Sequence, residues 1–363
     1  MVTLYDVARR AAVSIATVSR VVHGQDRVRE ATRIRVQQAI EELGYVPDGA
    51  AQSLSRRRKD IIGMMCVERE TAGQHDVETE CLLYYDEVQR GVQEQIRSSQ
   101  WLLLSSFIKT DRAGEPDLSR LNRLSGKVDG ILVGEGFADS RSIQRLAARL
   151  PVVIIAGTPG AQAADVVAAD NFSGAAALIT HLIADHGSQR LYHVGGPPNS
   201  PDAIQRRLAL DYTLRNHPQC QLIGSAQGVF SVASGEQAGK ELLARPRAAR
   251  PDAVVCANDQ MAIGVLRTLT AAGIRVPGEI AVTGFDDLYP ARLADPPLTT
   301  VHQPMRTLGE RACARLLDRI ARPGLSPAVQ LLPTELVLRS SCGCPPGPAT
   351  RQAVKTIRPA HAN

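Results

Sequence analysis

The chain has 363 residues, a formal net charge of +5, a hydrophobic fraction of 44% and a charged fraction of 22%. This length exceeds one small domain and fits a large two-lobed body plus a small module, with the composition of an ordinary globular protein. No apolar run approaches the roughly 20 residues of a membrane-spanning helix, which argues against an integral membrane protein. Asp6, Arg9 and Arg10 interrupt the amino terminus, so we do not expect an export signal. The odd number of cysteines, seven, favours reduced thiols in the cytoplasm over a disulfide framework.

The positive charge is concentrated near the amino terminus. Residues 1–60 hold 11 Lys and Arg against 7 Asp and Glu, whereas the remainder of the chain holds 31 against 30. A concentrated positive field suits phosphate binding, because neutralising phosphates releases condensed counterions. A solvated basic terminus is the alternative, and the helical pattern around these charges disfavours it.

Residues 3–44 carry the pattern of three short helices. Thr3 and Asp6 form a Thr-x-x-Asp capping box for the first, Ser14 caps the second, and Gly44 stops a third that spans residues 30–43. Helical spacing then predicts an inward face made of Leu4, Val7, Ala8, Ala11, Val18, Val21, Val22, Val36, Ile40 and Leu43.

The second helix presents a different set of residues outward. Helix, tight turn, helix is the helix-turn-helix arrangement, whose second helix enters the major groove of DNA. Arg20 can donate two hydrogen bonds to guanine, a contact worth ~1–3 kcal/mol of discrimination. Ile15 and Ala16 can contact a thymine methyl group. A three-helix bundle with a neutral surface, the alternative, gives no reason to expose them. The residues expected to contact phosphates are Thr3, Tyr5, Ser14, Thr17 and Ser19.

The head resembles that of the lactose/galactose repressor (LacI-type) family of bacterial transcription regulators. The resemblance rests on Val-Ser-x-x-Thr-Val-Ser-Arg-Val at 13–21, Glu-Leu-Gly-Tyr-Val-Pro at 42–47 and Ala-Ala-Gln-Ser-Leu at 50–54. It implies a hinge helix that forms on DNA, with Leu54 wedged into the minor groove and Ala51 closely packed. Asp48-Gly49 departs from the family pattern, and glycine weakens a helix by about 1 kcal/mol, so we expect a looser hinge off DNA. The further residues expected to bind DNA are Leu4, His23, Arg27 and Tyr45.

From residue 61 onward, short β-rich runs alternate with amphipathic helical stretches, which is typical of parallel α/β layers. The strand candidates are 61–67, 101–107, 130–133, 152–156, 190–194, 253–257 and 279–284, and the helix candidates include 86–98, 173–185 and 261–272. Residues 60–340 resemble the family's core of two doubly wound lobes of the periplasmic-binding-protein type. The expected fold class is therefore a small all-α helix-turn-helix head plus an α/β body. The expected domains are 1–46 for the head, 47–60 for the hinge helix and linker, 61–341 for the two lobes and 342–363 for a disordered tail.

Ligands of parallel sheets bind beyond the carboxyl ends of the strands, and the resemblance assigns residues there. It implies that Arg206 and Asp286 hold effector hydroxyls or a ring nitrogen, with Asn258 adding a polar contact. Asp259 and Asp287 are interpreted as structural caps. In the family motif Arg-x-x-Gly, alanine replaces glycine at position 209. The other expected effector-binding residues are Tyr84, Tyr85, Asp170 and Phe230. Each of the three aromatic residues, taken singly, is more often part of a hydrophobic core.

Two segments stay ambiguous at this stage. Residues 68–80 form a long acidic loop that either selects a cationic or hydroxyl-rich effector or is a solvated insertion. Cys342-Gly343-Cys344 is a pair without a neighbouring Cys or His in the sequence, so it cannot complete a tetrahedral site, and we expect no metal and no cofactor. Beyond Ser341 the chain is proline-rich and has no heptads, which predicts a disordered tail and a homodimer rather than a tetramer held by a coiled coil.

Together these features predict a sequence-specific transcription regulator that represses a carbohydrate-utilisation operon. It would bind a quasi-palindromic double-stranded DNA operator and respond to a small effector, a sugar or a derivative, in the cleft between the lobes. A solute-binding protein of a sugar transporter would explain the body but not the basic head. An enzyme would need a nucleophile elbow, a phosphate-binding loop or a metal cluster, and the sequence offers none of these motifs.

Overall fold

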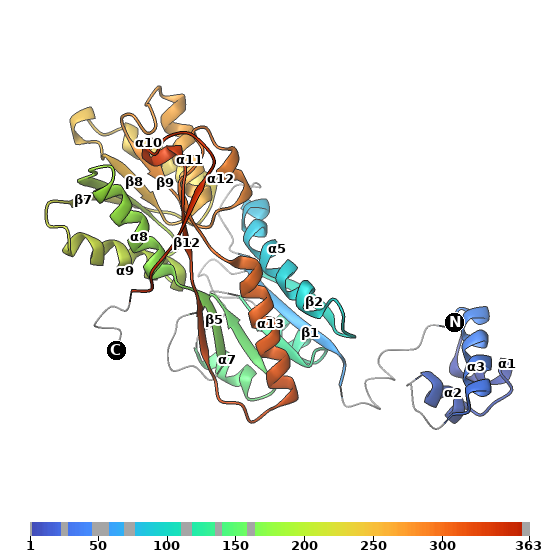
Figure 1. The fold of residues 1–363 in the computed structure, drawn as a ribbon. Coiled ribbons are helices and arrows are strands. Elements are labelled where there is room, and N and C mark those ends of the chain that lie inside the picture. Colours follow the sequence, from blue (N-terminus) through green and yellow to red (C-terminus); the bar gives the residue numbers. More distant parts are fainter. Residues whose placement is uncertain are drawn as a thin grey trace. The chain divides into compact units, whose positions relative to one another are not determined.

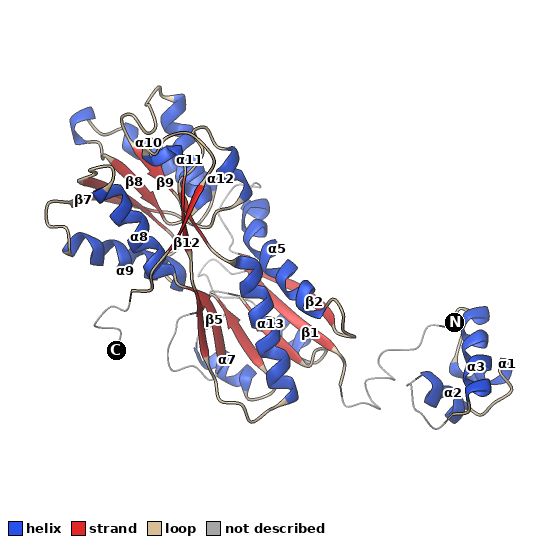
Figure 2. Ribbon diagram, in the orientation of Figure 1, coloured by secondary structure: helices blue, strands red, loops and turns tan. Residues whose placement is uncertain are grey.

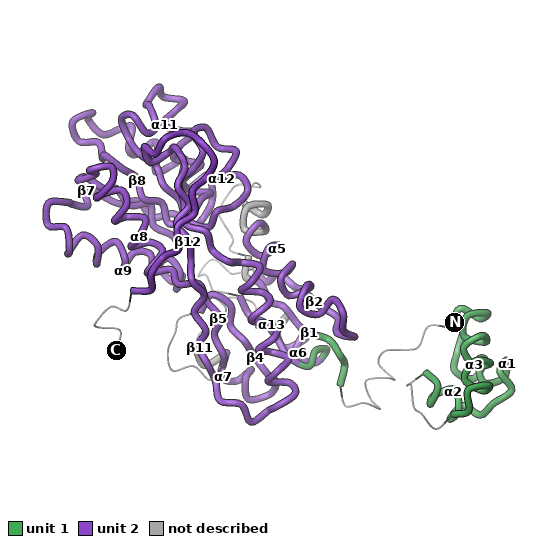
Figure 3. The backbone as a smooth tube through the Cα atoms, in the orientation of Figure 1, with its two compact units in different colours: residues 1–61, 127–129 green, residues 62–126, 130–363 purple. Residues whose placement is uncertain are grey.

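The structure of the protein, a computed structural model, describes residues 2–22, 28–45, 58–68, 77–109, 118–134, 140–157 and 164–357. The chain divides into two compact units (Figure 3). The first comprises residues 1–61 and 127–129, and the second comprises residues 62–126 and 130–363.

The first unit contains the head, in which the three predicted helices are confirmed. They are α1 (Leu4–Arg10), α2 (Ile15–Val22) and α3 (Glu30–Leu43). The backbone N–H and the hydroxyl of Thr3 both donate to the Asp6 carboxylate, at 3.0 and 2.7 Å, as expected of the capping box. Gly44 ends α3 in the left-handed conformation, with φ of 60°, as the sequence predicts.

The head has its own small hydrophobic core. Most of the inward residues that helical spacing predicts are buried in it, and Leu4, Val22, Ile40 and Leu43 pack against it while partly exposed. Tyr45, expected to bind DNA, is only 7% exposed and belongs to this core. The fully buried members are Val7, Ala8, Ala11, Val18, Val21, Val36, Ala39 and Tyr45.

The second unit contains two α/β lobes, which are visible as separate sheets flanked by helices in Figures 1 and 2. In the first lobe the strand order is β11-β5-β4-β3-β1-β2, and the pairings from β1 to β11 are parallel. The strands are β1 (Ile61–Glu68), β2 (Leu102–Lys109), β3 (Gly130–Val133), β4 (Val152–Ile155), β5 (Asp165–Ala169) and β11 (Val329–Leu332). The helices are α5 (Val77–Ile96), α6 (Leu118–Ser125), α7 (Ser140–Ala147) and α13 (Met305–Ala321).

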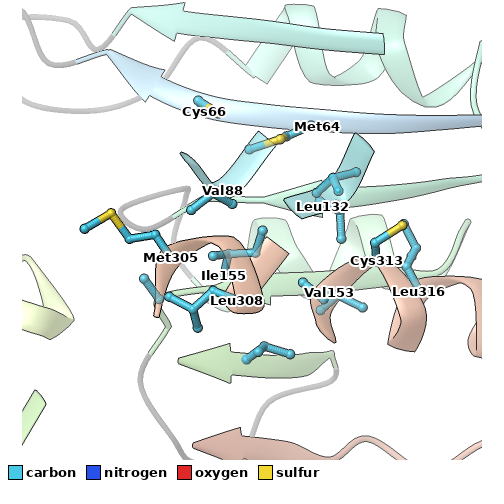
Figure 4. Packing of buried hydrophobic residues seen from close by; sticks show 14 of the residues in the cluster. Met64, Cys66, Val88, Leu132, Val153, Ile155, Met305, Leu308, Cys313 and Leu316 are labelled. Atoms are coloured by element: carbon cyan, nitrogen blue, oxygen red, sulfur yellow. The ribbon is translucent and has the colours of Figure 1, made fainter. Parts of the chain in front are cut away.

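One face of the first sheet is covered by α5 and α13, which run side by side (Figure 1). Alternate strand residues such as Met64, Leu132 and Ile155 point into this layer, where they meet Val88 of α5 and Leu308 of α13 (Figure 4). Because α13 follows the second lobe in the sequence, this core joins segments that are more than 200 residues apart.

The second lobe is a parallel sheet with the order β7-β6-β8-β9. Its strands alternate strictly between two cores: Val254 of β8 packs on the face with α10 and α11, whereas Val255 packs on the face with α8 and α9. This is the doubly wound arrangement that the sequence predicts. The elements are β6 (Arg190–Gly195), β7 (Gln221–Gln227), β8 (Ala253–Cys256), β9 (Ala281–Thr283), α8 (Asn171–Ala184), α9 (Pro201–Arg215), α10 (Val232–Leu243), η1 (Arg247–Ala249), α11 (Asp259–Ala271) and α12 (Tyr289–Leu293).

A small antiparallel sheet, with the order β10-β12-β13, accompanies the crossover between the lobes, where β12 is drawn in red in Figure 2. Its strands are β10 (Thr300–His302), β12 (Glu335–Leu338) and β13 (Thr350–Ala353), and η2 (Ser340–Cys342) precedes β13. The expectation of a disordered tail from residue 342 is therefore wrong as far as residue 357. Cys342 is buried, β13 pairs with β12, and the backbone N–H of Ile357 donates to Ser173 Oγ at 2.8 Å.

The predicted strands all recur, with ends that differ by at most a few residues, but one helix differs substantially. Helix α5 begins at Val77, nine residues before the expected start, so part of the predicted acidic loop is helical. Residues 69–76 of that loop lie outside the described residues. Among helices in the described ranges, none combines the length and the apolar character needed to cross a bilayer.

Close helix packing in the second lobe generates a prediction for stability. A Cβ atom on Gly264 of α11 would lie 2.1 Å from the backbone carbonyl oxygen of Val232 in α10. Alanine favours a helix by about 1 kcal/mol over glycine. We nevertheless expect Gly264→Ala to lower the free energy of unfolding by about 1–3 kcal/mol, because the two helices must separate. Gly324→Ala is the control, since nothing lies within 4 Å of a Cβ there. Equal urea denaturation midpoints for the two variants would contradict the prediction.

Candidate DNA-binding surface and effector site

Helix α2 has one buried face and one exposed face. Val18 and Val21 anchor it in the head core, whereas Ile15, Ala16 and Arg20 are exposed. An isoleucine that is 40% exposed beside an exposed arginine is the surface expected of a helix that contacts base edges.

The polar residues predicted to contact phosphates lie around this face. Thr3, Tyr5 and Ser14 are exposed, and Thr17 and Ser19 are half-buried. Ser14 Oγ accepts a hydrogen bond from the backbone N–H of Thr17 at 3.2 Å, so this hydroxyl also caps α2. Leu4, another predicted contact, packs partly against the head core.

Four of the predicted DNA-binding residues cannot be placed. His23, Arg27, Ala51 and Leu54 lie outside the described residues, as does most of the predicted hinge. Their roles stay predictions from the sequence.

The second lobe contains a buried polar cluster centred on Arg206, which we call the arginine cluster: Asn171, Asp202, Arg206, Asp286 and Gln303. Ser200 caps α9, and two turns of that helix place Arg206 against the first residue of α8, where its Nε donates to Asn171 Oδ1 at 2.8 Å. Arg206 also donates to the carbonyl oxygen of Ala257, which follows β8. Its Nη2 lies 3.5 Å from Asp286 and 3.6 Å from Asp202. All five residues are at least nine-tenths buried.

Two aromatic rings lie near the guanidinium group of Arg206. Its Cζ atom is 3.8 Å from the ring centroid of Phe285 and 6.0 Å from that of Phe230. A guanidinium group stacks favourably on an aromatic face, more so when both are removed from water. Phe230 thus lies near Arg206, as the sequence predicts, while Phe285 was not identified.

The carboxylates after β9 have different environments. Asp286 and Asp287 both have positive φ, 125° and 59°, a strained conformation for residues other than glycine. Asp286 accepts from Gln303 Nε2 at 2.5 Å. Burial acts to raise the pKa of Asp287, but hydrogen bonds from His302 and Arg339 and the charges of the arginines outweigh it, and the pKa is lowered.

Asn258 is the N-cap of α11 and Asp259 is its first residue, and both make hydrogen bonds within the fold. Burial, and then the nearby charge of Asp286, raises the pKa of Asp259. Asp259 accepts hydrogen bonds from the backbone N–H of Leu288 and from the hydroxyl of Thr300, so its interpretation as a structural residue agrees with its contacts. Asn258 caps α11 and donates to the carbonyl oxygen of Phe230 at 3.2 Å, which fixes the backbone that carries this ring.

The structure separates the remaining predicted effector residues. Asp170 caps α8 by accepting from the backbone N–H of Ser173 at 3.0 Å, and its neighbour Asn171 is the residue that contacts Arg206. Tyr84 and Tyr85 lie on α5 in the first lobe, with ring centroids 5.3 Å apart, and pack against its hydrophobic core.

A pocket of about 420 Å³ lies beside the arginine cluster. Its volume is in the range of small-molecule sites. Asp286 and Gln303 line it, together with Leu83 and Asp86 of α5, so it is bordered by both lobes. The Oε1 atom of Gln303 is buried without a hydrogen-bond partner among the described residues. Arg206 lies behind Asp286, and it therefore positions the carboxylate that faces this pocket.

Comparison with known proteins agrees with both parts of this geometry. Residues 3–48 match the bacterial regulatory proteins of the lacI family, and residues 179–342 match the periplasmic binding protein-like domain. The chain is 32% identical over 347 residues to the HTH-type transcriptional repressor PurR of Mannheimia succiniciproducens, covering 94% of this chain and 98% of that protein. It is 34% identical over 336 residues to the ribose operon repressor of Escherichia coli K12, covering 90% of this chain and 95% of that protein. The chain belongs to the lacI family of bacterial regulatory proteins.

Solved structures of similar proteins include the lac repressor dimer bound to operator and the anti-inducer ONPF, with a TM-score of 0.77 and 28% identity over 94% of this chain and 99% of that one. The complex of the transcriptional regulator CelR with cellobiose has a TM-score of 0.68 and 30% identity over 94% of this chain and 100% of that one. This lacI-family protein is thus a DNA-binding transcription regulator with an effector-binding body, and not an enzyme. A solute-binding protein, the alternative interpretation, does not account for residues 3–48.

Substitution of two neighbouring arginines tests how much the buried ion pairs of the body contribute to its free energy of unfolding. Arg206→Ala removes the cation that lies 3.5–3.6 Å from the buried carboxylates of Asp202 and Asp286, so we expect it to lower the free energy of unfolding by about 3–5 kcal/mol. Arg207→Ala is the matched control, because Arg207 is 40% exposed and pairs with Asp211, itself 41% exposed, at 3.1 Å. We expect it to cost less than about 1 kcal/mol. Urea denaturation of both variants would show similar losses if the buried cluster were energetically unimportant.

Proposed function

We propose that the exposed face of α2 reads the operator, with Arg20 contacting a guanine and Ile15 and Ala16 contacting thymine methyl groups. The observation that supports this most directly is the exposure of these three side chains on a helix whose other face is fixed by Val18 and Val21. A rigidly held helix places its side chains at a constant depth in the groove, which base recognition requires. Thr3, Tyr5, Ser14, Thr17 and Ser19 contact phosphates and set the register.

The effector in this proposal is a sugar or a sugar derivative, and the regulator represses a carbohydrate-utilisation operon. Asp286 and Gln303 offer acceptors at the pocket between the lobes, and hydroxyl groups are the donors that match them. Leaving the Oε1 atom of Gln303 unsatisfied costs about 1–3 kcal/mol, which a bound hydroxyl would recover. Tyr84, Tyr85 and Phe230 supply ring surfaces on the two lobes. Relatives named for ribose, cellobiose and purine regulation make nucleobases the second class to test.

Effector binding alters DNA affinity by shifting the equilibrium between arrangements of the two lobes. A ligand that contacts both lobes binds one arrangement better than another, and only that difference can be transmitted. A typical coupling of ~1–3 kcal/mol changes DNA affinity about 5–150-fold.

The regulator acts in the cytoplasm as a dimer, since paired half-sites of an operator are read by symmetric protein pairs. Within the described residues, the chain from Ser340 onward forms η2 and β13, and β13 pairs with β12 of the same chain.

Substitution of Arg20 by alanine and by lysine separates its hydrogen bonds to a base from the effect of its charge. We expect Arg20→Ala to weaken binding to a duplex selected from genomic fragments by about 30-fold or more, because it removes ~1–3 kcal/mol of base recognition at each of two half-sites. Arg20→Lys keeps the charge but not the paired hydrogen bonds, so we expect it to lose discrimination while its affinity for random duplex stays within about twofold of the unaltered protein. Fluorescence anisotropy with both duplexes measures this. An unchanged ratio of specific to random affinity in Arg20→Ala would refute the assignment.

The effector site can be tested before its ligand is identified. We expect at least one compound in a thermal-shift screen of pentoses, hexoses, disaccharides and purines to raise the melting temperature, since a ligand at about 100 times its Kd stabilises the folded state by about 2.7 kcal/mol. Asp286→Asn should abolish that shift while leaving affinity for random duplex unchanged. Asp318→Asn, on the exposed surface of α13, is the control and should keep the shift. A hit whose shift survives in Asp286→Asn would place the effector elsewhere.

A further inference from the structure

The second lobe brings together two cysteines and two histidines that are far apart in the sequence. His181 lies in the last turn of α8, His186 follows that helix, and Cys342 and Cys344 flank a turn after β12. One ligand atom from each of the four residues lies within 4.8 Å of every other. We call these four residues the Cys2His2 cluster. The pair of cysteines that lacks a partner in the sequence therefore has two histidine partners in the fold.

We propose that the Cys2His2 cluster binds a single Zn2+ ion. Bonds of about 2.0–2.1 Å to nitrogen and about 2.3 Å to sulfur set tetrahedral edges of about 3.4 Å between two nitrogens and about 3.6 Å between nitrogen and sulfur. The Nε2 atoms of His181 and His186 are 3.1 Å apart. Three nitrogen–sulfur separations in the cluster are 3.4, 3.5 and 3.6 Å. These spacings match the edges within a few tenths of an ångström, and two thiolates with two imidazoles are a donor set typical of structural zinc.

The contacts of His181 also favour a metal over a set of hydrogen bonds. Its Nδ1 atom lies 2.6 Å from the carboxylate of Asp185, which places the ring proton there, as in carboxylate–histidine–zinc triads. The Nε2 lone pair then faces both sulfur atoms and the second imidazole at once. A single lone pair can accept from one donor, whereas a metal ion can accept a pair from all four groups.

The backbone around the cluster is shaped for this arrangement. Gly343 has φ of 112°, and a Cβ atom there would lie 3.0 Å from His186 Nδ1, so glycine is needed between the two cysteines. Cys342 is held by the hydroxyl of Thr299, which donates to its sulfur at 3.1 Å. Four residues separate the histidines, a spacing common in zinc sites, although one residue between the cysteines is fewer than usual.

The site fixes the start of the carboxy-terminal extension, residues 342–357. Beyond Cys344 the chain forms β13, from which Arg351 reaches Asp287 at 2.8 Å, and ends its described course at Ile357 beside Ser173. The extension thus begins near His181 in the last turn of α8 and ends near Ser173 in its first, about 12 Å away along the helix axis. A metal at one end would hold this segment against the helix that supplies Asn171 to the arginine cluster.

The first experiment is the metal content of the full-length protein, purified under reducing conditions without chelator. We expect about one zinc ion per chain by plasma mass spectrometry. Replacement by Co2+ should give the visible absorption bands of tetrahedral cobalt together with thiolate-to-cobalt charge transfer. An apo protein that takes up neither ion, and a cobalt spectrum typical of octahedral oxygen ligation, would each overturn the proposal.

Variants distinguish this site from adventitious binding. We expect Cys344→Ser and His186→Gln to reduce the zinc content at least tenfold. Cys220→Ser should retain it, because Cys220 is a buried thiol of the same lobe that bonds instead to the carbonyl oxygen of Ser188. Should the ligand variants fail to fold, a chelator added to the unaltered protein gives the same test. It should lower the melting temperature by several degrees in the unaltered protein and in Cys220→Ser.

Counting free thiols distinguishes the zinc site from a disulfide between Cys342 and Cys344. The denatured, metal-free protein should present all seven thiols of the sequence to a thiol reagent. Two fewer, with Cys342 and Cys344 joined in a peptide map, would show a disulfide and overturn the proposal. Because the Cys2His2 cluster contains none of the residues assigned to DNA or effector binding, its failure would leave the proposed function intact.

Discussion

The central strands of the two lobes, β3, β4, β5 and β8, are buried on both faces, and this constraint decides where chemistry can occur. In β8, Val254 and Val255 enter opposite hydrophobic cores, so no side chain of the strand interior is available to a ligand. Polar side chains that can meet a ligand therefore gather beyond the carboxyl ends of the strands. The arginine cluster occupies the carboxyl end of the second sheet, and the Cys2His2 cluster lies at the opposite end of α8.

Burial of Arg206 follows from the same constraint. A guanidinium group removed from water is tolerated when hydrogen-bond acceptors surround it, and here they come from α8, α9 and the turns after β8 and β9. Each acceptor belongs to a different element, so the position of the carboxylate that faces the pocket depends on how these elements pack. A ligand that moves the carboxylate of Asp286 must therefore act on several elements together. Coupling between ligand binding and DNA binding requires such a concerted change.

Features encoded by neighbouring residues could be predicted from the sequence, whereas those that depend on distant pairing could not. The head helices agree closely because Thr3, Ser14 and Gly44 mark their ends locally. The family resemblance pointed to Arg206 and Asp286, which lie together in the structure. It did not identify Asn171, the neighbour of Asp170 that contacts Arg206, since adjacent polar residues look alike until the helix phase is known. The order of residues 350–357 was missed because the pairing of β13 with β12 and the hydrophobic contacts of Val354 and Ile357 give no local pattern. Likewise, His181 lies more than 150 residues before Cys342, so spacing alone made the cysteines look unpartnered.

Helix α8 links these observations in one element. It is buried along most of its length, so a shift of its axis would disturb both faces of the second lobe. Its first turn supplies Asn171 to the arginine cluster, and its last turn supplies His181 to the Cys2His2 cluster. The carboxy-terminal extension runs between the same two places and adds Arg351 to the carboxylate beside Asp286. A zinc ion bound by the Cys2His2 cluster would thus stabilise α8 at the end opposite the arginine cluster.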